Sequence, residues 1–85
     1  MPENIHRFSA PVRGGEAIYE AHVLGDRRSD GTWCGWLEFR PVGQSGRPLR
    51  TGQETSQPNR WALDYWAGGL EPVYLEGALT RARAD

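Results

Sequence analysis

The strongest constraint in this chain is a pair of segments with a two-residue hydrophobic period. Such alternation is typical of strands that bury one face only. In EAIYEAHVL, residues 16–24, the side chains on one face are Ala17, Tyr19, Ala21 and Val23. In TWCGWLEFRPV, residues 32–42, the residues on one face are Trp33, Gly35, Leu37 and Phe39. The two segments therefore predict an antiparallel hairpin.

The loop between these segments decides which faces combine. Residues 25–31, GDRRSDG, contain the glycine and Asp-Gly pair typical of turns. A loop with an odd number of residues puts the two apolar faces on the same side, whereas a two-residue turn at Asp30-Gly31 would put Glu20 and His22 there instead. A shift of one residue removes a whole face from the core, so we predict the odd loop.

The rest of the chain predicts one more strand, a helix and an ambiguous end. Residues 43–48 form a turn, and residues 49–55 a weaker strand with Gly52 at a bulge or an edge. Residues 56–70 predict a helix that begins near Pro58, ends at left-handed Gly68 and Gly69, and buries a wide apolar arc. Residues 72–82 fit a strand or a helix, and Gly77 favours the strand.

These elements predict one α+β domain, a small antiparallel β-meander with one packed helix in the order strand–strand–strand–helix–strand. We expect residues 1–15 to be a flexible N-terminal arm, from which Ile5 and Phe8 are able to dock, and residues 16–82 to be the domain. A chain of 85 residues has a thin stability margin, which four Trp offset in part. A homodimer that completes the core is therefore an option.

Composition narrows the partners and the compartment. The net charge of −1 provides no general attraction for nucleic acid or an anionic membrane. All ten basic residues are Arg, which we interpret as the codon bias of a GC-rich bacterial genome. A single cysteine fits a reducing cytoplasm, residues 1–15 lack the apolar core of a signal peptide, and no apolar run is long enough for a membrane span. We expect a cytoplasmic protein.

The sequence offers little for catalysis, a metal or a cofactor. In the register chosen above, His22 is close to Cys34, which raises a Cys-His nucleophile as a hypothesis. A buried or half-exposed structural cysteine is the interpretation we favour. The ligand spacings of a zinc site are missing, and GQSGRP, residues 43–48, lacks the lysine of a phosphate-binding loop. We predict no enzyme, no metal and no cofactor.

The best candidate contact surface is the mixed face of the hairpin. Trp36 and Arg40 share this face with Glu38, and an aromatic residue beside arginines is typical of contact surfaces. Arg27 and Arg28 extend the candidate binding residues, and Arg47 and Arg50 extend them further. The partner we expect is another protein or a second copy, reached through this face or through the edge at residues 49–55. An Arg- and Trp-based nucleic-acid-binding module is the alternative.

Short segments give a resemblance to a known family. These are DGTW (30–33), TGQET (51–55) and AL (62–63). They resemble the hairpin turn and the helix entry of the HicB family of antitoxins, over residues 17–79. The resemblance implies a partial RNase-H-like fold and an antitoxin that inhibits a small RNase toxin. The chain departs from the family at RPVGQSG (40–46) and in its Trp-rich helix.

Overall fold

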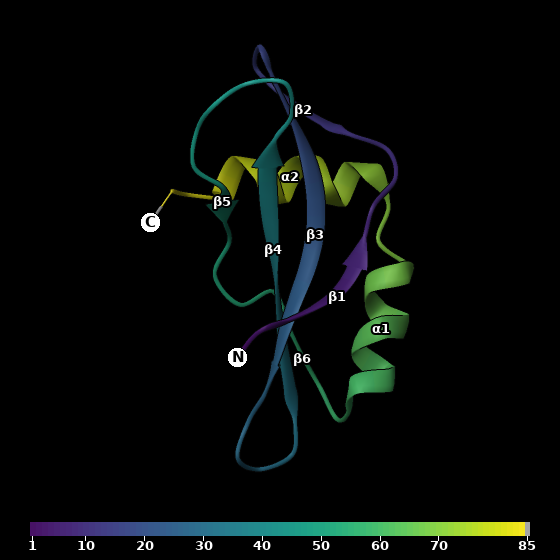
Figure 1. Cartoon of the computed structure of the whole chain (residues 1–85). Coiled ribbons are helices and arrows are strands. Elements are labelled where there is room, and N and C mark those ends of the chain that lie inside the picture. The colour runs from purple at the N-terminus through teal and green to yellow at the C-terminus, as the bar shows by residue number, and fades with distance from the viewer. Residues whose placement is uncertain (85) are drawn as a thin grey trace.

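The computed structural model describes residues 1–84 and has a single antiparallel sheet with two helices on one of its faces (Figure 1). The strands are β1 (Glu3–Arg7), β2 (Val12–Gly14), β3 (Ala17–Arg27), β4 (Trp33–Pro41), β5 (Leu49–Arg50) and β6 (Thr55–Gln57). The helices are α1 (Arg60–Gly68) and α2 (Pro72–Arg81). The long strands β3 and β4 form the centre, β1 and β2 pair with β3, and β5 and β6 pair with β4. The predicted α+β class is confirmed.

The β3–β4 hairpin has the predicted parity, although its loop is shorter than the one predicted at residues 25–31. Its loop, residues 28–32, has an odd number of residues, and Val23 lies opposite Leu37. Gly31 has a φ of 90°, and the side chain of Asp30 accepts hydrogen bonds from Thr32. The two apolar faces therefore combine on one side of the sheet. There they form most of the buried core together with residues of both helices.

Two facing glycines bring α1 close to the sheet. Gly25 lies directly opposite Gly35, and Leu63 of α1 sits over both. A Cβ atom at Gly25 would be 2.6 Å from Cδ2 of Leu63, and one at Gly35 would be 2.7 Å from its Cδ1. Leu63 is fully buried, so it fills the space that the missing side chains leave.

The N-terminal segment differs from the expected flexible arm. Residues 1–15 include β1 and β2, which pair with successive parts of β3. The register between β1 and β3 shifts between Asn4 and His6, and Ile5 at this bulge is buried in the core. Phe8 also packs against the core, as expected for docking side chains. The segment forms strands because β4 occupies only one edge of β3, so the other edge is available to β1 and β2.

The third strand is interrupted, whereas the sequence predicts a continuous one. β5 and β6 both pair with β4, and Thr51 lies just after β5. Its backbone N–H donates to the Leu37 carbonyl at 3.0 Å, and its hydroxyl accepts from the Leu37 N–H at 3.0 Å. Thr51 is buried and satisfies both polar groups of Leu37. An isolated bridge between Arg50 and Arg83 covers part of the outer edge of β5. A shorter stretch of the edge predicted for partner binding is therefore exposed.

Helix α1 is shorter and less buried than predicted. Asn59 caps its first turn by accepting from the Ala62 N–H at 2.8 Å, and it ends before Gly69, whose φ of −91° is not left-handed. Only Leu63 and Ala67 are buried. Trp61 is 73% exposed and Tyr65 74% exposed. The predicted wide arc is wrong because this short helix packs on the sheet along one narrow stripe.

The last element is the helix α2, so the strand favoured for residues 72–82 is wrong. Pro72 stands at the first turn, where a missing N–H costs nothing. The residues Leu75, Ala78 and Leu79 follow helical spacing and are buried. Their burial outweighs the helix penalty of about 1 kcal/mol for Gly77.

A polar contact ties α2 to the loop before β6. The Tyr74 hydroxyl donates to Glu54 Oε1 at 2.5 Å, and Arg81 donates to the same atom at 2.7 Å. Burial and the hydrogen bond to Glu54 raise the pKa of Tyr74 to about 12. The hydroxyl therefore remains a donor throughout the physiological pH range.

We predict that Gly25→Ala lowers the free energy of unfolding by about 1–3 kcal/mol, because the new methyl group would displace the fully buried Leu63 side chain. Urea unfolding monitored by tryptophan fluorescence measures the change. Gly52→Ala is the matched control, since a Cβ atom added at Gly52 would have no neighbour within 4 Å. Equal stability of the two variants would contradict the close packing of α1 on the glycine pair.

Candidate functional site

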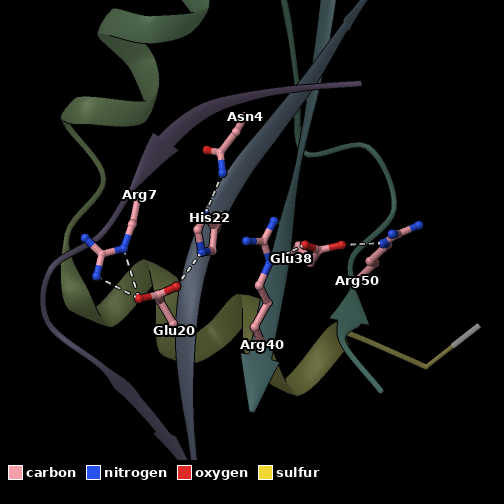
Figure 2. A network of polar contacts seen from close by, with 7 residues as sticks. All are labelled: Asn4, Arg7, Glu20, His22, Glu38, Arg40 and Arg50. Carbon is pink, nitrogen blue, oxygen red and sulfur yellow. Dashed lines mark hydrogen bonds and ion pairs between the residues drawn. The ribbon is translucent and has the colours of Figure 1, made fainter. Parts of the chain in front are cut away.

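The sheet face opposite the helices, named here the open face, carries a set of side chains in cross-strand rows. Because paired residues of antiparallel strands point to the same side, the register defines these rows. One row holds Asn4, Leu24 and Trp36, the next Arg7, His22, Glu38 and Arg50, and a third Glu20 and Arg40. The polar members are drawn in Figure 2. The open face thus has one partly apolar row beside two rows of charged groups.

Glu38 is the centre of the charged rows. Its side chain is 5% exposed, and its two carboxylate oxygens accept from Arg40 Nε at 2.7 Å and from Arg50 Nε at 2.8 Å. Burial raises the pKa of Glu38, but the hydrogen bonds from the two guanidinium groups outweigh that effect and hold the pKa below its usual value. The buried carboxylate is therefore ionised at neutral pH.

A second cluster surrounds His22, whose side chain is 3% exposed (Figure 2). Its Nδ1 lies 2.8 Å from the Asn4 amide nitrogen, and its Nε2 lies 2.8 Å from Glu20 Oε1. Arg7 donates from Nε and from a terminal nitrogen to the other oxygen of Glu20, both at 2.9 Å. The hydrogen bonds from His22 and Arg7 lower the pKa of Glu20. Both ring nitrogens of His22 are thus engaged.

The partly apolar row combines Trp36 with its cross-strand neighbour Leu24. Trp36 is half-buried, and Leu24 is buried although it does not belong to the main core cluster. Trp36 also shares its strand face with Glu38, two residues further along β4. The partly exposed indole therefore lies next to the charged rows, as the sequence predicts.

The structure separates the two loop arginines from the predicted contact residues. Arg27 lies opposite Trp33, on the side of the sheet that faces the helices. Arg28 donates to the hydroxyls of Thr32 and Ser56 and to the side chain of Gln53, so it ties the hairpin loop to the segment before α1. Arg28 follows the last residue of β3, and at about 3.3 Å per residue it is roughly 26 Å from the position opposite Arg40. Trp36, Glu38 and Arg40 do lie together.

The hypothesis of a Cys-His nucleophile is wrong. His22 lies opposite Glu38, whereas Cys34 lies opposite Asp26, four residues further along β3. This separation is about 13 Å at strand spacing. The thiol of Cys34 is half-buried and donates to the Asp26 carbonyl at 3.6 Å. A loop at residues 25–31 would put His22 opposite Cys34, whereas the observed loop at 28–32 keeps the parity but moves the pairing by four residues.

Sequence reasoning misses three features of the surface. Asn4 and Arg7 belong to the open face, although the sequence predicts an arm for their segment. The sequence predicts Arg50 only as an extension of the contact surface, because the contact of Arg50 with Glu38 depends on the register of the very short β5. Trp61 and Tyr65 fall on the predicted apolar arc, yet their rings stack on each other at 5.6 Å on the exposed side of α1.

Within residues 1–84, no group of three or more His, Cys, Asp and Glu side chains is arranged to hold a metal ion. Neither helix in this part of the chain has the length and apolarity needed to cross a bilayer. No family model, curated protein or solved structure matches the chain, so the resemblance to HicB antitoxins stays a prediction.

We predict that the stability of the protein falls as the pH falls through the ordinary range of glutamate. The pKa of Glu38 and that of Glu20 are lowered in the folded state, so their contribution is complete above a pH of about 4.5 and is lost below it. Glu38→Gln should lower the free energy of unfolding by about 1–3 kcal/mol at pH 7 and reduce the loss between pH 5 and pH 3.

Urea unfolding at pH 7, 5 and 3 measures both effects. Glu76→Gln removes the same charge from an exposed site on α2 and is the control. A pH dependence that is identical in wild type and Glu38→Gln would contradict an ionised, arginine-bound carboxylate at this position.

Proposed function

We propose that this chain is a small, non-enzymatic protein-interaction domain that acts in the cytoplasm through its open face. The observation that carries the proposal is the position of Trp36 beside ordered ion pairs, on the face that neither helix covers. A partly exposed aromatic residue next to Arg, within a polar surround, is typical of the residues that contribute most to protein–protein affinity.

The charges favour a protein partner over a nucleic acid. Tight nucleic-acid binding needs many uncompensated cations that replace the counterions of phosphates. On the open face Arg7 is bound to Glu20, while Arg40 and Arg50 are bound to Glu38. The net charge of the whole chain is −1. Paired charges of both signs suit the mixed surface of another protein.

The same contacts support a non-enzymatic role. A general base needs a nitrogen lone pair or a carboxylate that reaches a substrate. His22 is almost fully buried, and both its ring nitrogens are engaged by Asn4 and Glu20. Cys34 donates to a backbone carbonyl. These groups hold one another in place, which suits a rigid contact surface.

The experiment is an affinity capture from a lysate of the native cells with three forms of the full chain. We expect wild type and Trp61→Ala to retain the same partner and Trp36→Ala to lose it. Truncation of a central aromatic contact costs about 2 kcal/mol or more, roughly a 30-fold loss of affinity. Trp61→Ala is a matched control, because Trp61 is exposed on α1 and not on the open face. Thermal unfolding verifies that each variant is folded.

The outcomes distinguish the candidate partners. Capture of a small RNase would support an antitoxin role, which the HicB resemblance implies. A wild-type mass of two chains that becomes one chain in Trp36→Ala would identify a second copy as the partner. Loss of the partner in Trp61→Ala alone would contradict the proposal and move the contact surface to α1. Capture of single-stranded nucleic acid at low salt would favour the alternative module.

A further inference from the structure

One carboxylate on the open face holds two arginine side chains. Arg40 lies two residues beyond Glu38 on β4, and Arg50 lies directly opposite Glu38 on β5. Each donates from Nε to a different oxygen of Glu38, at 2.7 and 2.8 Å. The two guanidinium groups therefore flank the carboxylate on either side, as Figure 2 shows.

The geometry leaves the outer parts of both guanidinium groups available. The contacts described for Arg40 and Arg50 within residues 1–84 use Nε, so the terminal nitrogens point past the carboxylate. The side chains are 42% and 51% exposed, whereas that of Glu38 is 5% exposed. A guanidinium fixed at Nε still presents two terminal donors in its plane. The buried carboxylate thus positions two partly exposed cations.

Charge is not balanced at this cluster. Two arginines share the single negative charge of Glu38, which leaves one positive charge in excess. The neighbouring pair of Arg7 and Glu20 is balanced one to one. The surplus positive charge of the described ion pairs on the open face is therefore concentrated at Arg40 and Arg50. An anionic group of a partner would neutralise it.

The surroundings indicate which anion fits. Guanidinium groups bind both carboxylates and phosphates. A polynucleotide offers a long row of phosphates, but here only one charge is in excess, and Trp36 lies on the same strand face. An acidic side chain within a protein segment brings both a carboxylate and apolar atoms that can pack on an indole. This combination matches the protein partner proposed above.

We infer that Arg40 and Arg50 form a binding site for carboxylates of an acidic segment in the partner protein, with Glu38 as the positioning residue. The inference rests on the proposed protein-binding function of the open face. It adds the chemistry that selects the partner: an acidic stretch binds, and a neutral stretch of the same shape does not.

The test is a titration of the ¹⁵N-labelled full chain with a capped tetraglutamate peptide at low salt, monitored by NMR. We expect saturable shifts at the Nε–H signals of Arg40 and Arg50 and at the indole N–H of Trp36. The dissociation constant should rise at least fivefold in Arg40→Gln and in Arg50→Gln. Added salt should weaken the binding, because these contacts are partly exposed.

Two matched controls make the result specific. Capped tetraglutamine has the same length without the charges and should cause no shifts. Arg60→Gln removes an arginine of α1 that is bound one to one to Glu3, away from the open face, and should bind tetraglutamate like wild type. The backbone spectra of all variants verify that each retains the fold.

Three results would overturn the inference: the absence of shifts in wild type, equal binding by Arg40→Gln, Arg50→Gln and wild type, or an equal loss in Arg60→Gln. Tighter binding of inorganic phosphate than of tetraglutamate at the same signals would assign the site to phosphate instead. If tetraglutamate fails while capture of a protein still depends on Trp36, the proposed function stands without this charge selectivity. If capture fails while tetraglutamate binds at the two arginines, the carboxylate site stands and the proposed protein-binding function fails.

Discussion

The number of residues in the β3–β4 loop is the constraint on which the rest of this structure depends. The loop at 28–32 sets the parity of the hairpin, and parity decides which side of the sheet every residue of β3 and β4 faces. It places Gly25 opposite Gly35, so that Leu63 brings α1 onto the sheet. It also places Glu38 on the other side, between two arginines. One geometric choice therefore creates both the core and the open face.

The charged rows contribute more to the shape of the open face than to the stability of the fold. A buried ion pair gains little over an apolar replacement, because its Coulomb energy is largely spent on desolvation. Removal of one partner is costly, since the other charge is left buried. Glu38, once buried, thus constrains Arg40 and Arg50 to remain beside it. The same logic applies to Glu20, which joins His22 to Arg7. The result is a polar surface whose side chains are ordered before any partner arrives.

The sequence predicts the features that follow from the alternation of side chains along a strand. It misses those that depend on how much packing surface or strand edge a neighbouring element provides. Trp36, Glu38 and Arg40 could be placed on one face because strand parity alone determines it. The exposure of Trp61 depends on how much of a short helix the sheet can cover, and no local pattern encodes that. The same holds for residues 1–15, which contribute β1 and β2 because β4 leaves the other edge of β3 available for pairing. Helix α2 forms because burial of its apolar stripe outweighs the penalty of a glycine.

An ordered, partly buried set of charges restricts what can lie on this face. A purely apolar surface would bury the exposed ends of Arg40 and Arg50 without replacing their contacts with water, a cost of several kcal/mol per ion. A partner that binds as proposed would therefore have to supply acceptors at those ends and apolar atoms over Trp36. Since Glu38 fixes both arginines in advance, little side-chain entropy is lost when such a partner binds. Selection against neutral and basic surfaces then follows from the unpaired charges they would bury.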